Sequence, residues 1–280
     1  MPCSIITLTT DFGVGSPYVA QMKGVILSIN TDVSLVDITH EIAPQDVRSA
    51  AQVLDEACRW FPEGTIHVAV VDPGVGTERP LVCASLGCQH FIAPDNGLLS
   101  LVLRGADPIR IIRLADRRYW RKEVSSTFHG RDIMAPVAAY LSRGVSPDAF
   151  GPRHDQLVTL DFSQPTRTPN SVTGQIISID SFGNLISNID SAMLPSDVSR
   201  PSVRVQVGTH EIQGLVSTYG NGTPSALVAL INSAGRLEIA VVGGDAAQQL
   251  HARVGDEVVV FLTARFGHLA MHRDVPRETA

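Results

Sequence analysis

An acid and a base flank a glycine-rich loop that follows a strand pattern. Residues 66–71 form a largely apolar run, typical of a buried parallel strand, and Asp72-Pro73-Gly74-Val75-Gly76 ends it. Asp72 is therefore expected at the carboxyl end of a strand, where open α/β sheets bind ligands. Arg79 brings a permanent positive charge back to the same loop and can keep the carboxylate ionised. An ordinary turn with a solvated acid and a solvated base fits this loop equally well.

Asp11 and His129 are further candidates at the ends of elements. Asp11 closes the strand pattern of residues 5–10, where a carboxylate can accept hydrogen bonds from both hydroxyls of a ribose. His129 precedes the alanine-rich run 133–141, which predicts a histidine at a helix N-terminus. The competing interpretation of the segment around His129 is a helix-capping segment in which the histidine has no function.

Other polar groups at strand ends are interpreted as structural or left open. His40 and Glu41 follow the strand pattern of residues 33–39, and we interpret both as structural. The turn Asp95-Asn96-Gly97 either lines a pocket or simply reverses the chain. The pair Gly13-x-Gly15 lacks the third glycine of a dinucleotide fingerprint, since Tyr18 stands there, which disfavours a Rossmann site.

Strand and helix patterns alternate through the first half of the chain. This alternation predicts an α/β N-terminal domain with a mainly parallel sheet over residues 1–151. The expected strands are residues 5–10, 33–39, 66–71, 81–85, 90–93 and 109–114, and the expected helices are residues 19–29, 47–60 and 133–141, with Asp46 capping the second helix.

The second half of the chain is almost purely strand-like. Residues 152–169 are rich in proline and polar residues, which predicts a linker, and residues 170–280 are predicted to form a smaller all-β, barrel-like domain. Its expected strands are residues 172–180, 185–189, 203–207, 214–218, 227–231, 237–242 and 258–263.

Two loops of the all-β domain carry candidate binding groups. Asp180-Ser181-Phe182-Gly183-Asn184 offers an acid, an aromatic face and an amide in one short turn. An exposed Phe182 in a turn suggests that a planar ligand stacks on it. Ser233 follows Asn232 in a second polar loop, although both loops also fit ordinary hairpin turns.

Composition limits the classes of partner and location. The formal net charge is −6 and no basic run interrupts it, which disfavours nucleic acid. No apolar stretch is long enough to cross a bilayer, and the first residues lack the features of a signal peptide, so no membrane partner is expected. The four cysteines, at positions 3, 58, 83 and 88, complete no zinc pattern, and we interpret them as reduced thiols of a cytoplasmic protein without a metal or cofactor.

Six motifs in order make the chain resemble the S-adenosyl-L-methionine (SAM) hydroxide adenosyltransferases, or SAM hydrolases, which are relatives of fluorinase and chlorinase. The motifs are T-T-D-F-G at 9–13, D-P-G-V-G-T-x-R at 72–79, P-D-N-G at 94–97, F-H-G-R-D at 128–132, D-S-F-G-N at 180–184 and N-S-x-G-x-L-E-I-A at 232–240. The resemblance implies an α/β domain, a β-barrel domain and a homotrimer whose sites lie between subunits.

The resemblance also implies a role for each candidate residue. Asp72, Arg79 and His129 correspond to the family's water-activating trio, and Asp11 corresponds to the residue that holds the ribose hydroxyls. In the all-β domain, Phe182 and Asn184 are implied to contact adenine, and Asp180 and Ser233 to hold the amino and carboxylate ends of the methionine portion. Ser16 departs from the family, which commonly has an acid at that position.

Hydrolysis of SAM to adenosine and methionine is therefore the expected activity. The halogenating relatives carry an aromatic hydroxyl at the position of Asp72, a tyrosine at that of His129 and an inserted loop, none of which this sequence has. A SAM-dependent halogenase and a non-catalytic SAM or adenosine sensor are the alternatives. The reaction needs water held in line with the C5′–S bond and relieved of a proton, with Asp72 and His129 as candidate acceptors.

Overall fold

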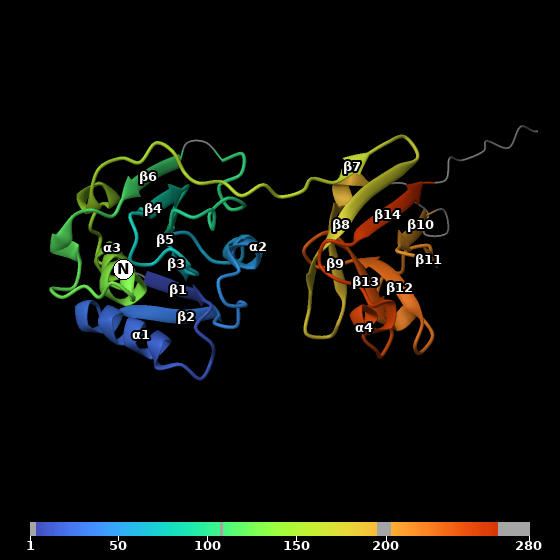
Figure 1. The fold of residues 1–280 in the computed structure, drawn as a ribbon, viewed down its shortest axis with the longest axis horizontal. Coiled ribbons are helices and arrows are strands. Elements are labelled where there is room, and N and C mark those ends of the chain that lie inside the picture. Colours follow the sequence, from blue (N-terminus) through green and yellow to red (C-terminus); the bar gives the residue numbers. More distant parts are fainter. Residues whose placement is uncertain (1–3, 107–108, 195–202, 263–280) are drawn as a thin grey trace, which may run out of the picture. The chain divides into compact units, whose positions relative to one another are not determined.

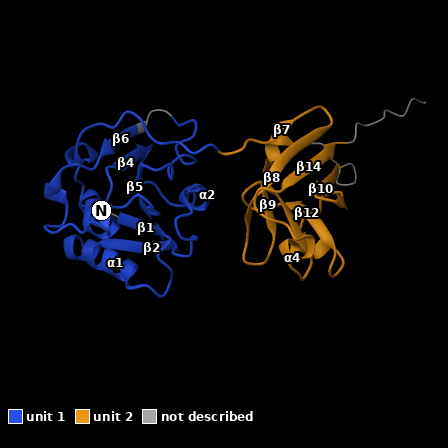
Figure 2. Cartoon of the chain, viewed as in Figure 1, with its two compact units in different colours: residues 1–161 blue, residues 162–280 orange. Residues whose placement is uncertain are grey.

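The protein divides into two compact units, Met1–Asp161 and Phe162–Ala280 (Figure 2). A computed structural model describes residues 4–106, 109–194 and 203–262. Cys3 and Thr263, which the sequence interpretation includes, lie outside these residues.

Unit 1 is built on a six-stranded mixed sheet in the order β2-β1-β3-β5-β4-β6 (Figure 1). The pairs β1/β2, β1/β3 and β3/β5 are parallel, whereas β4 is antiparallel to both β5 and β6. The predicted mainly parallel sheet is confirmed. Its strands are β1 Ser4–Thr10, β2 Val33–Thr39, β3 Ile66–Val70, β4 Leu81–Leu86, β5 Gln89–Pro94 and β6 Ile109–Arg113.

Helices cover both faces of this sheet. One core contains Met22 and Ile26 of α1 (Pro17–Ile29) with buried residues of α3 (Ala135–Ser142). The other core contains Leu54 of α2 (Val47–Cys58). Because the sheet is covered on both sides, every residue of β3 is buried, which explains its nearly continuous apolar sequence.

Side-chain caps start the first two helices, and the sequence predicts the second of these caps. Ser16 Oγ accepts a hydrogen bond from the backbone N–H of Tyr18, and Pro17 occupies the first turn of α1. Asp46 Oδ1 accepts from the backbone N–H of Ser49, so the predicted cap of α2 is confirmed.

The topology brings the ends of β1 and β3 to one edge of the sheet. The two strands are adjacent and parallel, with Thr10 paired to Val70. Asp11 and Asp72 follow these paired residues directly or after one residue, so both carboxylates leave the sheet at the same edge.

Unit 1 includes the first part of the predicted linker, residues 152–161. His154 Nε2 lies 2.9 Å from Oδ2 of the buried Asp95, and the backbone N–H of Val158 donates to Asp95 Oδ1 at 2.8 Å. Leu160 packs so closely on Gly97 that a Cβ there would lie 2.4 Å from Leu160 Cγ. The chain from residue 152 to about 160 is thus bound to the α/β unit, and Asp95 serves this contact.

Unit 2 contains an antiparallel, barrel-like sheet. The strand order is β11-β10-β14-β8-β9-β13-β12, with β7 paired to β8. In β10 the alternate residues Val203, Val205 and Val207 are buried in the core, as a sheet with one covered face requires. The elements are β7 Thr166–Arg167, β8 Ser171–Ile179, β9 Leu185–Asp190, β10 Val203–Val207, β11 His210–Gln213, β12 Leu227–Ile231, β13 Arg236–Val241, α4 Ala246–Leu250 and β14 Glu257–Leu262, and the chain also has short helical turns at Arg117–Tyr119, Pro147–Phe150, Ser191–Met193 and Tyr219–Asn221.

One expected strand of unit 2 is wrong. Residues 214–218 form no strand, and only Val216 makes an isolated bridge, to Leu230. The strand lies earlier, at β11, where Ile212 is the single buried residue. Val216 instead packs with residues of β12 and β13 in a small separate cluster, and its N–H donates to the carbonyl of Ala229 at 2.8 Å, so it makes one isolated contact beside β12 rather than a strand.

Candidate functional site

Asp72, Arg79 and His129 form one hydrogen-bonded group at the edge of unit 1. Arg79 Nε donates to Asp72 Oδ1 at 2.7 Å and to Oδ2 at 3.0 Å, and Arg79 Nη2 donates to Asp72 Oδ2. The same Nη2 lies 3.0 Å from His129 Nδ1. One guanidinium therefore holds both a carboxylate and an imidazole, although His129 is 50 residues further along the chain.

The contact with Arg79 defines the protonation of His129. A guanidinium has only donors, so His129 Nδ1 must accept, and the neutral ring carries its proton on Nε2. Burial lowers the pKa of His129, and the Arg79 charge lowers it further, while Asp72 and Asp132 oppose this shift. The net pKa lies below the usual value, which favours this neutral tautomer at neutral pH.

The group is largely withdrawn from solvent. The side chains of Asp72 and Arg79 are 6% and 10% exposed. Removing one partner of an ion pair this buried strongly destabilises the folded protein, because the other charge is left uncompensated.

Three glycines let the loops approach closely enough to form the group. A Cβ on Gly76, whose φ is +81°, would lie 2.5 Å from the carbonyl oxygen of Ser126. A Cβ on Gly130 would meet Val70 Cγ1 at 3.0 Å, and one on Gly74 would meet Arg79 Cδ at 3.0 Å. The loop after β3 and the segment carrying His129 are thus in backbone contact, which glycine permits.

The segment around His129 begins a helix, as the sequence indicates. His129 precedes one π-helical turn, Gly130–Met134, which continues into α3. Such irregular turns are frequent at functional sites. Here the wider turn brings the buried Gly130 against the end of β3.

Asn96 supports the strand end that carries Asp72. Its Nδ2 donates to the backbone carbonyl of Val71 at 2.9 Å. Within the Asp95-Asn96-Gly97 turn, Asn96 therefore supports the candidate site through the backbone of the residue that precedes Asp72.

Asp11 is held at the same edge by a residue in an unusual conformation. Asp11 Oδ2 accepts a hydrogen bond from the backbone N–H of Gln45 at 2.8 Å, and Gln45 has a φ of +67°. His40 Nδ1 lies 2.9 Å from Thr10 Oγ1, and its carbonyl accepts from the N–H of Gly13, so His40 ties the loop after β1 to the end of β2. This is a structural contact, consistent with our interpretation of His40.

Aromatic rings join the loop of Asp11 to the segment of His129. Phe12, Tyr18 and Phe128 contact one another edge to face, with centroid separations of 5.2–5.7 Å. Asp11 and His129 are the immediate neighbours of Phe12 and Phe128, so these rings set the spacing of the two segments.

The Asp180 loop of unit 2 is closed by its own acid. Asp180 Oδ1 accepts from the backbone N–H groups of Phe182 and Asn184, and Oδ2 accepts from Asn184 Nδ2, all at 2.9 Å. Asn184 is buried, whereas the Phe182 side chain is 75% exposed, as the sequence predicts. A Cβ on Gly183 would lie 2.1 Å from Oδ1 of Asp245, the residue that caps α4.

Ser233 lies exposed in the second polar loop of unit 2. Asn232 Oδ1 accepts from the backbone N–H groups of Ala234 and Arg236, both at 3.0 Å, and so shapes this turn. The structure therefore assembles Asp11, Asp72, Arg79 and His129 on unit 1, while the binding candidates at positions 180, 182, 184 and 233 belong to loops of unit 2.

Some contributors to these sites carry no separate signal in the sequence. Gln45 reaches Asp11 from a loop whose residue types are ordinary for a turn, and Ser126 contributes only its carbonyl. The sequence shows the glycines of the Asp72 loop, but it does not show that the Ser126 carbonyl is the group that requires Gly76 to lack a side chain.

The part of the chain that the structure describes offers neither a metal-binding cluster nor a membrane-spanning helix. No group of three or more histidine, cysteine, aspartate or glutamate side chains there could hold a metal ion. No helix there is long and apolar enough to cross a membrane. Cys58, Cys83 and Cys88 are free thiols.

Comparisons with known proteins agree across both units. Residues 6–151 match the family model described as the SAM hydroxide adenosyltransferase N-terminal domain, and residues 174–259 match that of the C-terminal domain. The chain is 37% identical over 257 residues to the (R)-S-adenosyl-L-methionine hydrolase of Thermus thermophilus, covering 88% of this chain and 95% of that protein. It is 35% identical over 262 residues to the enzyme of the same name from Salinispora tropica, covering 92% and 98%.

More distant relatives and solved structures extend the comparison. A fluorinase from an Actinoplanes species is 28% identical over 295 residues, covering 91% of this chain and 97% of that protein. A crystal structure of an uncharacterized conserved protein from Thermotoga maritima superposes with a TM-score of 0.86 at 38% identity, covering 91% of this chain and 99% of that one. With both family domains matched in order, and with relatives above 30% identity along nearly their whole length, this chain belongs to the SAM hydroxide adenosyltransferase family.

Proposed function

We propose that this protein hydrolyses SAM to adenosine and methionine. The observation that carries the proposal is the Arg79 guanidinium, which holds the Asp72 carboxylate and the His129 imidazole together. Family membership and the names of the 34–37% identical relatives support SAM as the substrate.

The reaction requires a nucleophile more than it requires an acid. Water attacks C5′ of the ribose, a C–O bond forms, and the C5′–S bond breaks with its electron pair going to sulfur. Methionine then leaves as a neutral thioether that needs no proton. One proton of the attacking water stays on the new 5′-hydroxyl, and the other must be accepted by the protein, so the site needs a base placed beside the water.

Asp72 is the group best suited to accept that proton. Its Oδ2 accepts two hydrogen bonds from Arg79, whereas its Oδ1 accepts only one and keeps a lone pair for a proton. The paired guanidinium fixes the orientation of the Asp72 carboxyl group.

His129 serves as a donor in this scheme. Its Nδ1 accepts from Arg79, so Nε2–H is the ring donor that would hold the oxygen of the attacking water. This assignment follows from the tautomer and makes Asp72 the base and His129 the residue that orients the water.

The remaining candidates are proposed to bind the substrate. Asp11 would accept the ribose hydroxyls, and the exposed ring of Phe182 would stack on adenine beside Asn184. Asp180 and Ser233 would hold the methionine portion. Asp180 already accepts three hydrogen bonds within its loop, so its first task is to shape that loop. Ser16 caps α1 rather than supplying the acid that is common in the family.

A homotrimer with sites completed by a neighbouring subunit is proposed from the family resemblance, and light scattering of the purified protein tests it. A cytoplasmic location is proposed because the three described cysteines are unpaired.

Product analysis tests the proposed activity. Purified protein is incubated with SAM in chloride buffer, and the products are separated by chromatography. Adenosine and methionine in equal amounts are expected. Formation of 5′-chloro-5′-deoxyadenosine would instead identify a halogenase, and tight SAM binding without turnover would identify a sensor.

A pair of variants then tests the base. Asp72→Asn keeps the shape of the side chain but removes the charge, and kcat should fall about 10²-fold or more, with a smaller change in KM. The matched control is Asp148→Asn, since Asp148 is 56% exposed and pairs with Arg110 at the surface. A normal kcat in Asp72→Asn would remove Asp72 from its catalytic role.

A further inference from the structure

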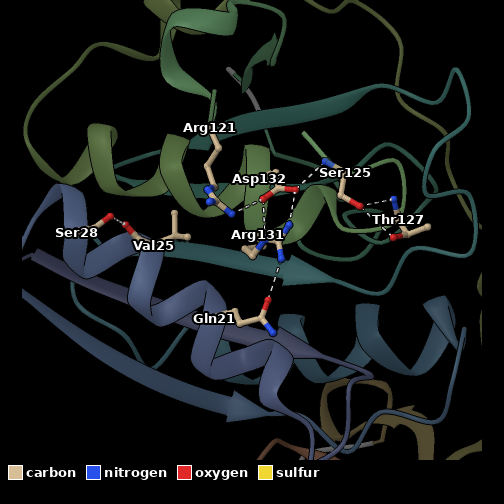
Figure 3. Close-up of polar contacts among 8 residues, drawn as sticks. All are labelled: Gln21, Val25, Ser28, Arg121, Ser125, Thr127, Arg131 and Asp132. Atoms are coloured by element: carbon tan, nitrogen blue, oxygen red, sulfur yellow. Dashed lines mark hydrogen bonds and ion pairs between the residues drawn. The ribbon is translucent and has the colours of Figure 1, made fainter. Parts of the chain in front are cut away.

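A second carboxylate, Asp132, lies three residues after His129 and is completely buried. Figure 3 shows its contacts with Arg121, Ser125 and Arg131. Its Oδ1 accepts from Arg131 Nε at 2.7 Å and from Arg121 Nη1 at 3.1 Å. Its Oδ2 accepts from the backbone N–H of Ser125 at 2.8 Å and from Arg131 Nη2 at 2.9 Å. Each oxygen thus receives two donors, which accounts for the lone pairs of a carboxylate.

This arrangement is that of an ionised, fully satisfied group. Burial favours the neutral acid, but the Arg131 hydrogen bond, the Ser125 amide and the guanidinium charges outweigh it, so the pKa of Asp132 lies below its usual value. No acceptor capacity is left for a ligand, which indicates that Asp132 acts within the protein.

Asp132 closes a loop onto the start of the helix. Besides its side-chain bonds, its backbone carbonyl accepts from the N–H of Arg121 at 2.9 Å, and its N–H donates to the carbonyl of Phe128 at 3.1 Å. Residues 121–128 are therefore attached to Asp132 at both ends and, through Ser125, in the middle.

The closed loop lies against the loop that carries Asp72 and Arg79. The carbonyl of Ser126, next to Ser125, lies where a side chain on Gly76 would be. Gly76 belongs to the loop that carries Asp72 and Arg79. A shift of the loop around Ser125 would therefore move the Asp72 loop relative to His129, whose own segment is packed on Val70 through Gly130.

Arg131 extends the network to α1. Its Nη1 donates to Gln21 Oε1 at 2.9 Å (Figure 3), and its guanidinium lies over the ring of Phe128 at 4.9 Å from the centroid. The residues on both sides of His129 are thus fixed, Phe128 by stacking and Gly130 by packing, while Asp132 fixes Arg131.

We propose that Asp132 is a positioning residue that holds His129 within hydrogen-bonding distance of Arg79 by fastening residues 121–128 to the start of the helix. This inference rests on the proposed function for its effect on turnover, but its geometric part concerns the protein without substrate. Asp132 touches neither Asp72 nor Arg79 and acts only through the segment that carries His129.

The test combines kinetics with a measurement of the imidazole. Asp132→Asn is compared with Arg110→Gln, which removes an arginine–aspartate pair that is about half exposed in the same unit. Each protein is assayed for kcat and KM with SAM, alone and combined with His129→Gln. The tautomer of His129 is read from its ¹⁵N imidazole shifts in the substrate-free protein, with the resonance assigned, among nine histidines, by its loss in His129→Gln.

A distinct pattern is expected. Asp132→Asn should lower kcat about tenfold with KM changed less than about threefold, because a misplacement well under 1 Å is costly for reacting groups. In the His129→Gln background it should add less than about a twofold loss, since residues acting through one another are not additive. His129 should change from a single Nε2–H tautomer to a mixture, while Arg110→Gln should change nothing.

Several outcomes would overturn the proposal. A folded Asp132→Asn with wild-type kcat and an unchanged tautomer would do so, and so would an equal loss of kcat in both backgrounds. If Asp132→Asn does not fold, Arg121→Gln replaces it. This variant removes one hydrogen-bond donor to Asp132, and the Arg121 side chain is 44% exposed. A wild-type kcat and an unchanged His129 tautomer in Arg121→Gln would also reject the proposal. If no protein turns over SAM, the proposed function fails, while the tautomer measurement still decides the positioning role.

Discussion

The stability of unit 1 should depend on pH through one buried histidine, His67. His67 lies in β3, the strand that leads to Asp72, and is 1% exposed. Its ring stacks on Phe91 at 4.9 Å and contacts Phe61 edge to face, and its Nδ1 lies 2.8 Å from Thr7 Oγ1. Its Nε2 has no hydrogen-bond partner in the described part of the chain. Nothing there compensates a positive charge on the ring.

The magnitude follows from the pKa. Burial lowers the pKa of His67 from 6.5 to about 4. The unfolded chain therefore binds a proton at a pH where the folded protein does not, so stability is complete above pH 6.5 and declines as the pH falls toward 4. A shift of this size corresponds to a total of about 3 kcal/mol, of which about 2 kcal/mol is lost by pH 5.

Urea unfolding at pH 7 and pH 5 measures this loss. The chain has two tryptophans, Trp60 and Trp120, and both lie in unit 1, so fluorescence reports on that unit. His67→Gln removes the titrating group. Each protein is compared with itself at the two pH values, which cancels the cost of the substitution. The natural protein should lose about 2 kcal/mol more than the variant between pH 7 and pH 5. An equal loss in both proteins would refute this account of His67.

Three further predictions concern the site and the thiols. Gly76→Ala should lower the free energy of unfolding by about 2 kcal/mol or more and turnover about tenfold, because φ is +81° and the new Cβ would meet the Ser126 carbonyl at 2.5 Å; unchanged melting and kcat would contradict the close approach. Since the pKa of His129 is lowered by burial and its charged neighbour, kcat should persist below pH 6.5 and fall only as Nδ1 is protonated; a midpoint at or above pH 6.5 in the kcat profile would be evidence against the tautomer assignment. Burial raises the pKa of Cys83 to about 12, so a thiol reagent at pH 8 should label the exposed Cys88 and spare Cys83 in peptide mass spectra, whereas labelling of both at similar rates would show that the core opens readily.

The α/β half of the fold could be predicted because its signals are local. The apolar run of β3 and the capping side chain of Asp46 each depend on neighbours in the sequence. The turn that follows β3 and carries Asp72 and Arg79 could be predicted for the same reason.

Unit 2 shows where local signals are not enough. β11 has a single buried residue, Ile212, and its alternation is too short to detect. Val216 packs beside β12 and makes one isolated bridge to it, so the apolar sequence around it indicated a strand that does not form. An apolar residue indicates packing, and packing against a sheet does not require a complete strand.

The long-range contacts of the candidate site were beyond the sequence alone. Motif order and resemblance brought Asp72, Arg79 and His129 into one hypothesis, but the contact of Arg79 with His129 Nδ1 depends on the tertiary fold. The same holds for Asp132, whose neighbours at positions 121 and 125 reach it only through the folded loop.

Isotope labelling tests the central claim most directly. SAM is incubated with the protein in H₂¹⁸O, and the adenosine and methionine formed are analysed by mass spectrometry. Attack of water on C5′ places one ¹⁸O in the 5′-hydroxyl of adenosine and none in methionine, and Asp72→Asn should abolish most of this product. Adenosine without ¹⁸O, or label appearing in methionine instead, would contradict the proposed reaction.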